Sequence, residues 1–281
     1  MRDLTVAAAF AGAVGAVTAW PASRAALARP PERLFRTNVS GKRVPAVLGH
    51  PVVIGGVTSI VAAAWLSPLL VWPEVQPDRW GGAALIVLLV MATAGAWDDG
   101  RGDERPRGFA GHLGAARGGR MTGGIVKVLA AGGGGAVAGF VLYGWDKPAI
   151  VLTVAAVGLG ANLVNLLDRA PGRAGKFTLA AGVPLAAFGS FEWGIAAAGT
   201  LVALTVVLPA DLGERGMLGD AGANPLGALL GLGLVASFDG PALAAAVVVL
   251  LALNLASERW SFSKVIERTP PLRWLDAIGR K

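Results

Sequence analysis

The sequence predicts an all-α, polytopic integral membrane protein with about nine transmembrane helices, its N-terminus outside and its C-terminus inside. The first observation behind this prediction is composition. The chain of 281 residues is 54% hydrophobic and only 15% charged, whereas soluble domains are nearer a quarter charged. The second is that the apolar residues gather in long uncharged segments. The third is that the basic residues lie almost entirely on one side of those segments.

Nine segments contain no Asp, Glu, Lys or Arg over 15 to 30 residues, and a helix needs about 20 residues to cross the hydrocarbon. They are 4–23, 44–73, 80–97, 128–145, 148–167, 177–191, 193–210, 221–238 and 240–257. The sixth is marginal in length, but Lys176 can extend it by snorkelling. A cleaved signal peptide is the alternative for the first segment, although 20 apolar residues are long for one. We expect a transmembrane domain over 1–257 and a cytoplasmic amphipathic tail over 258–281.

The orientation follows from the basic residues. With the N-terminus outside, only Arg2, Arg79 and Lys147 of the 25 Lys and Arg residues face outward, as the positive-inside rule requires. The net charge of +7 is therefore expected to face the cytoplasm and anionic lipid rather than nucleic acid. We predict a multi-pass protein of the inner (plasma) membrane. The absence of Cys excludes a disulfide framework and a thiolate metal site.

Acidic and amide residues form three groups at the inner ends of the predicted helices. They are Asp98 with Asp99, then Asn162, Asn165 and Asp168 at a spacing of three, and then Asp220 with Asn224. The spacing places the second group along one helix face. Each group alone could be a solvated helix end, but three at one membrane face favour a site. We expect their side chains to converge on one cytoplasmic pocket.

The chemistry of these groups suits a divalent cation and phosphate. Carboxylate and amide oxygens are hard ligands for Mg²⁺, which is usually shared with substrate phosphates. Nearby cations could neutralise phosphate oxygens; they are Lys42, Arg43, Arg120, Lys127, Arg173 and Lys176. The sequence therefore predicts a phosphoryl-transfer site at the bilayer surface.

In these motifs the chain resembles the polyprenyl-phosphate N-acetylhexosamine-1-phosphate transferases, which include phospho-N-acetylmuramoyl-pentapeptide transferase. Asp98-Asp99, the run from Asn162 to Asp168, and Gly219-Asp220-Ala-Gly222 look like the acidic signatures of that superfamily. The stretch 38–45 is similar to its basic Gly/Pro loop, and 108–113 and 122–127 look most like a less studied bacterial branch. Nearly the whole chain is covered, with the motifs in the family's order.

The resemblance implies transfer of a sugar-1-phosphate from a nucleotide sugar to polyprenyl phosphate, with Mg²⁺ or alternatively Mn²⁺, in cell-wall biogenesis. It implies catalytic roles for Asp98, Asp99 and Asp168, and metal binding by Asp220 and Asn165. The implied substrate-binding residues are Asn38, Lys42, Arg43, His112, Lys127, Asn162, Arg173, Lys176 and Asn224. Polyprenyl phosphate, the nucleotide sugar and the membrane are the expected partners, with no nucleic acid, and a homodimer is left open.

The chain departs from the family in three respects. We count nine helices where the family usually has ten, and the only histidines, His50 and His112, lie outside the last loop, where the family carries a cluster. After Asp168 the family pattern Gly-x-Asp-Gly is replaced by a basic Pro/Gly stretch. The alternative function is a lipid-linked sugar transporter or an inactive scaffold of cell-envelope assembly. The acids lie at helix ends rather than mid-membrane, which favours the transferase over alternating access.

The tail is predicted to form a short amphipathic helix. Pro270-Pro271 breaks any continuous helix, and apolar residues then recur at helical spacing with charged ones between them. Trp274 and the arginines favour a position in the membrane interface. There the tail would partly cover the active cleft in place of the family's histidine loop.

Overall fold

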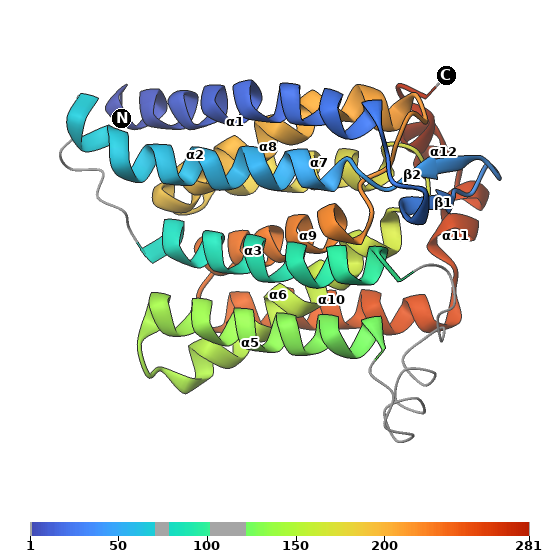
Figure 1. The fold of residues 1–281 in the computed structure, drawn as a ribbon. Helices are drawn as coiled ribbons and strands as arrows, with labels where there is room; N and C mark the ends of the chain where they lie inside the picture. The colour runs from blue at the N-terminus through green and yellow to red at the C-terminus, as the bar shows by residue number, and fades with distance from the viewer. Residues whose placement is uncertain (1, 71–78, 102–121, 281) are drawn as a thin grey trace.

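The computed structural model describes residues 2–70, 79–101 and 122–280, and nearly all of this chain is helical (Figure 1). The helices are α1 (Arg2–Ala28), α2 (Gly49–Leu70), α3 (Arg79–Asp99), α5 (Gly123–Tyr143), α6 (Lys147–Leu167), α7 (Arg173–Phe188), α8 (Phe191–Leu212), α9 (Asp220–Ser237), α10 (Gly240–Arg259), α11 (Phe262–Arg268) and α12 (Pro270–Ala277). One 3₁₀ turn, η1 (Glu32–Leu34), precedes a two-stranded antiparallel hairpin of β1 (Phe35–Thr37) and β2 (Arg43–Pro45). The hairpin lies in a loop for which the sequence predicted no regular structure.

The long helices α1 to α10 follow the predicted apolar segments in order. Among the described residues, six helices are long and apolar enough to cross a membrane: α1, α3, α5, α6, α8 and α10. The chain is therefore an all-α membrane protein. Crossing by α2, α7 and α9, and with it a total of nine spans, stays a prediction.

The boundary between α7 and α8 differs from the predicted segment 177–191. Helix α7 begins earlier, at Arg173 after the left-handed Gly172, and ends at Phe188. Helix α8 begins at Phe191 because the Ser190 side chain accepts a hydrogen bond from the Trp193 amide. The positions of charged residues, which bounded the predicted segments, do not reveal a serine cap.

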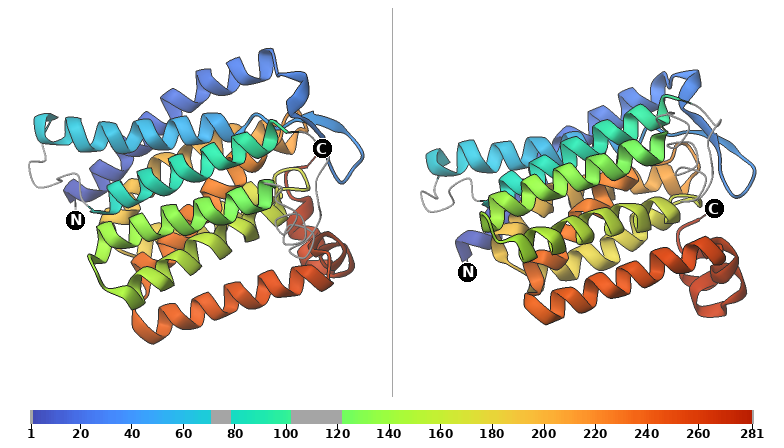
Figure 2. Two further views of the ribbon diagram at one scale, coloured as in Figure 1. Left: turned by 60° about the horizontal axis from the view of Figure 1, so that its bottom comes forward. Right: turned by 90° about the horizontal axis from the view of Figure 1, so that it is seen from below.

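Helix α9 forms the centre of the bundle. It packs against α3 on one side and most extensively against α6 on another. A Cβ at Gly227 or Gly231 would overlap the backbone of α6, so glycine lets these two helices approach closely. Helix α10 lies at the edge of the bundle (Figure 2), where it packs mainly against α6 and exposes most of its apolar length.

The two ends of the bundle carry different structures. Helix α1 starts at one end, and the hairpin, the α6–α7 turn, the α8–α9 turn and the C-terminal helices gather at the other (Figure 1). We call the latter the acidic end, because Asp98, Asp99, Asp168 and Asp220 all lie there at helix termini. This shared end is what brings distant sequence motifs together.

Candidate functional site

The centre of the candidate site is an ammonium group held between two carboxylates. Lys127, on the first turns of α5, places its Nζ atom 2.7 Å from Asp98 Oδ2 and 2.7 Å from Asp220 Oδ2. Asp98 is contributed by the last turn of α3, and Asp220 is the first residue of α9. Because both carboxylates are almost fully buried, a charge here is little screened by solvent. Three helices from separate parts of the sequence thus present their charged groups to one point.

Two glycines allow these three helices to meet. A Cβ at Gly123 of α5 would overlap the Asp98 carboxylate, and a Cβ at Gly95 of α3 would overlap the backbone carbonyl of Asp220. Position 95 therefore requires glycine for the close approach of two backbones, and a side chain at Gly123 would displace the Asp98 carboxylate. Sequence reasoning did not single out either residue for this role, because a glycine in a glycine-rich helix carries no signal of its neighbour.

The other two predicted catalytic acids hold the first turn of α9. Asp99 Oδ2 accepts a hydrogen bond from the Ala221 amide at 2.9 Å, and Asp168 Oδ2 accepts one from the Gly219 amide at 2.8 Å. A helix N-terminus carries unsatisfied amides and a partial positive charge, both of which favour carboxylates. Gly219 itself has φ +68° and offers no side-chain cap. Asp99 and Asp168 therefore fix the backbone that presents Asp220.

Asp168 lies in a second buried acidic group beside the first. Burial raises the pKa of Asp168 well above the ordinary value of 3.8, and the nearby Asp211 carboxylate raises it further. Asp211, at the end of α8, is itself buried. The cavity that these two acids help to line measures about 10 Å³, which is room for one water.

The sequence analysis missed Asp211 and Glu214 as members of this region. Asp211 directly follows an uncharged segment, as Asp98 does, and that position was a usable signal. Glu214 accepts hydrogen bonds from Ser40 Oγ at 2.5 Å and Asn38 Nδ2 at 2.6 Å. These hydrogen bonds lower its pKa. The hairpin is thereby joined to the α8–α9 turn.

The predicted basic residues of the hairpin, Lys42 and Arg43, contact acidic residues near the hairpin. Lys42 lies 3.7 Å from the Glu214 carboxylate and is half exposed. Arg43 forms an ion pair with Glu32 and stacks over the Phe35 ring at 4.8 Å. Contacts of Lys42 and Arg43 with phosphate stay predictions.

Arg36 is the hairpin residue that reaches the site, and the sequence analysis did not identify it. Its guanidinium donates a hydrogen bond to the backbone carbonyl of Asp99. The hairpin tip also bonds to the α6–α7 turn, where the Val39 amide donates to the Arg169 carbonyl at 3.0 Å. The hairpin thus connects two of the three acidic groups.

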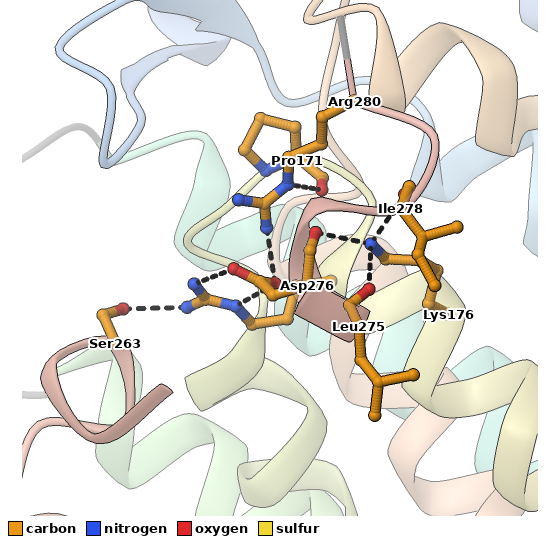
Figure 3. A network of polar contacts seen from close by, with 8 residues as sticks. Pro171, Lys176, Ser263, Leu275, Asp276, Ile278 and Arg280 are labelled. Carbon is orange, nitrogen blue, oxygen red and sulfur yellow. Dashed lines mark hydrogen bonds and ion pairs between the residues drawn. The ribbon is translucent and has the colours of Figure 1, made fainter. Parts of the chain in front are cut away.

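Arg173 and Lys176, predicted to bind substrate, contact the C-terminal tail. Arg173 donates to both carboxylate oxygens of Asp276 at 2.8 Å and to Ser263 Oγ at 2.8 Å. Lys176 Nζ donates to three backbone carbonyls at the end of α12, as Figure 3 shows. Both side chains therefore have partners in the tail, and their role in substrate binding stays a prediction.

The predicted amide residues divide among three environments. Asn162 donates to Asn254 Oδ1 of α10 at 2.6 Å. Asn165 is half-buried on the last turn of α6, and within the described residues its side chain makes no hydrogen bond. Asn224 is fully buried one turn after Asp220, and its Nδ2 atom has no partner in the described part of the chain. His112 lies outside the described residues.

The donor set fits Mg²⁺ only if substrate completes it. Among the described residues, no three His, Cys, Asp or Glu side chains gather closely enough to hold a metal ion. Mg²⁺ is commonly held by one or two carboxylates plus phosphate oxygens and water. Asp98 and Asp220 supply that number of carboxylates at one point, which a cationic group already occupies.

Comparison with known proteins does not assign the chain to a family. No protein-family model matches the chain, and no curated protein matches it.

Proposed function

We propose that this protein transfers a sugar-1-phosphate, of the N-acetylhexosamine type, from a nucleotide sugar to polyprenyl phosphate. The reaction would take place at the cytoplasmic face of the inner (plasma) membrane and release a nucleoside monophosphate. The observation that carries the proposal is the Lys127 ammonium between Asp98 and Asp220 at one end of a membrane bundle. The resemblance of the acidic motifs to polyprenyl-phosphate sugar-1-phosphate transferases supports it.

The physical problem in this reaction is to bring two anionic phosphates together. Lys127 offers a fixed positive charge in a little-hydrated position, where electrostatic stabilisation is strongest. Asp220 would hold Mg²⁺, or alternatively Mn²⁺, with Asn165 as the further ligand expected from the resemblance. The metal when bound would neutralise the donor pyrophosphate. The acidic end therefore has both the cation and the carboxylates that the chemistry needs.

The reaction is a displacement at phosphorus. An oxygen of the acceptor phosphate attacks the phosphorus that carries the sugar, and the bond from that phosphorus to the oxygen bridging the two phosphates breaks. The nucleoside monophosphate leaves with the bridging oxygen. Asp98, in contact with Lys127, would position the acceptor phosphate or accept its proton. Asp99 and Asp168 would keep the first turn of α9, and with it Asp220, in place.

The test is direct turnover. Purified protein, polyprenyl phosphate and Mg²⁺ are incubated with a panel of nucleotide sugars, and nucleoside monophosphate is measured. We expect release with at least one donor, dependence on Mg²⁺, and loss of release in Asp98→Asn. The control is Glu267→Gln, which removes an exposed acid of α11 and should leave turnover unchanged. No release from a folded protein with any donor would contradict the proposal and favour the transporter or scaffold.

We also propose nine crossings with the acidic end in the cytoplasm. The supporting observation is that α1 starts at the end opposite the tail (Figure 1). The chain has no Cys, so single cysteines at Lys147 and Ala277, both exposed, can be labelled in intact cells. We expect labelling by an impermeant reagent at Lys147 only. Equal labelling of both positions would refute the orientation.

A further inference from the structure

The C-terminal helices are fixed to the bundle by their polar side. Asp276 of α12 receives two hydrogen bonds from Arg173, each 2.8 Å, and one of 2.5 Å from Arg280. Attraction to these two arginines outweighs burial and lowers the pKa of Asp276. The bidentate geometry also sets the rotation of α12 about its axis, because a planar guanidinium must face both carboxylate oxygens.

Lys176 and Arg280 complete this attachment (Figure 3). Lys176 Nζ bonds to the carbonyls of Leu275, Asp276 and Ile278, at 3.1, 2.6 and 2.9 Å. These carbonyls belong to the end of α12, where a helix has no internal partner for them. Arg280 Nε donates to the Pro171 carbonyl at 3.0 Å. The polar side of α12 is thus satisfied by the protein itself.

The apolar side of α12 points away from the bundle. Leu272, Trp274 and Leu275 are 41%, 67% and 51% exposed, whereas Asp276 is half-buried. At 100° per residue these three lie on one side of the helix, and Asp276 lies outside their arc. A helix on a soluble protein normally has the reverse arrangement, with its apolar side against the core. An exposed apolar side of this kind marks a contact with something else.

The neighbouring surface indicates what that partner is. Helix α10, which leads into the tail, exposes a continuous apolar length, as a lipid-facing helix does, and Trp260 at its end is 61% exposed. The two short helices α11 and α12 also carry exposed basic residues; they are Lys264, Arg268 and Arg273. Trp and Leu beside Lys and Arg are typical of helices in the interface of anionic membranes.

We propose that α11 and α12 form an interfacial anchor that binds the headgroup region of an anionic bilayer. Leu272, Trp274 and Leu275 enter the boundary between headgroups and acyl chains, while Arg173 and Lys176 hold the opposite side of α12 to the start of α7. On α11, Phe262 and Ile266 pack against the core of the bundle, so the anchor lies at the rim of the acidic end. This proposal does not depend on the proposed catalytic function.

The test uses nitroxide labels at two positions on the same helix. Leu275→Cys lies on the apolar side and Ala277→Cys on the other, and both residues are exposed. The protein is placed in nanodiscs of phosphatidylcholine with phosphatidylglycerol, and label accessibility to oxygen and to a water-soluble nickel chelate is measured. We expect the oxygen-to-nickel ratio to be several-fold higher at Leu275 than at Ala277. Discs of phosphatidylcholine alone should reduce the difference.

Two results would overturn the proposal. If nickel reaches both labels equally in anionic discs, α12 lies in water. If the Leu275 label is protected from oxygen and nickel alike, protein covers the apolar side instead of lipid. The variant Asp276→Asn weakens the attachment to Arg173 and should reduce the difference between the labels, because α12 is then free to rotate. An unchanged difference in this variant would contradict the role of the attachment.

Discussion

Replacing Lys127 by Met tests whether the centre of the site is a buried ion cluster. The substitution keeps the length and apolar stem of the side chain and removes the ammonium that lies 2.7 Å from both Asp98 and Asp220. The three side chains are 18%, 4% and 11% exposed for Lys127, Asp98 and Asp220. Two buried carboxylates would then face each other without a counter-charge.

The expected loss is large for a single substitution. Removing one partner of a buried ion pair costs about 3–5 kcal/mol, and the residual exposure of Lys127 favours the lower end of that range. We therefore expect Lys127→Met to lower the free energy of unfolding by about 3 kcal/mol. Lys127→Met combined with Asp220→Asn should recover part of this loss, because the repulsion between two buried carboxylates is removed while Asp98 stays unpaired.

The assay is unfolding in a titration with SDS, followed by the fluorescence of the nine tryptophans. The matched control is Lys147→Met, which removes an exposed lysine from the opposite end of the bundle and should change the free energy by less than about 0.5 kcal/mol. A loss under about 1 kcal/mol for Lys127→Met, the size of an exposed salt bridge, would refute the buried cluster.

Three further predictions concern other parts of the acidic end and the bundle. Because burial and a neighbouring carboxylate raise the folded-state pKa of Asp168 above 3.8, its contribution to stability is full below pH 3.8 and is lost as pH rises through the raised pKa. Unfolding titrations across pH should therefore show a flatter decline for Asp168→Asn, and an identical decline would contradict this. A Cβ at Gly49 would overlap the backbone of α9, so Gly49→Ala should abolish a monodisperse peak in gel filtration. Gly132→Ala, with nothing within 4 Å of its Cβ, should be tolerated and gain about 0.5–1 kcal/mol. Asn224→Leu removes a buried amide nitrogen without a described partner and should raise the free energy of unfolding by about 1 kcal/mol while lowering turnover; a fall in stability would show that the amide is bonded.

Much of the fold could be predicted from the sequence because each long helix corresponds to a continuous uncharged run of residues. An uncharged run of spanning length is sufficient to indicate a helix in a membrane protein, and the described long helices follow the predicted runs in order. Helix boundaries that depend on single residues were harder to predict from the sequence. The left-handed Gly172 precedes the start of α7, and the Ser190 cap sets the start of α8, so both helices begin before the uncharged segments that predicted them.

The sequence by itself also determined which end of the bundle carries the acids Asp98, Asp99, Asp168 and Asp220, because acids directly beside apolar runs must lie at helix ends. Only the tertiary structure decided how these acids are used. Asp98 and Asp220 share Lys127, whereas Asp168 bonds to the backbone at the start of α9. Arg173 was grouped with phosphate ligands by its position, yet it pairs with Asp276 of the tail, 103 residues further along the chain. The reason is physical: periodicity and charge along a chain specify the face and depth of a side chain, but its partner depends on helix packing, and here close packing depends on glycines such as Gly95 and Gly123 whose neighbours no local pattern records.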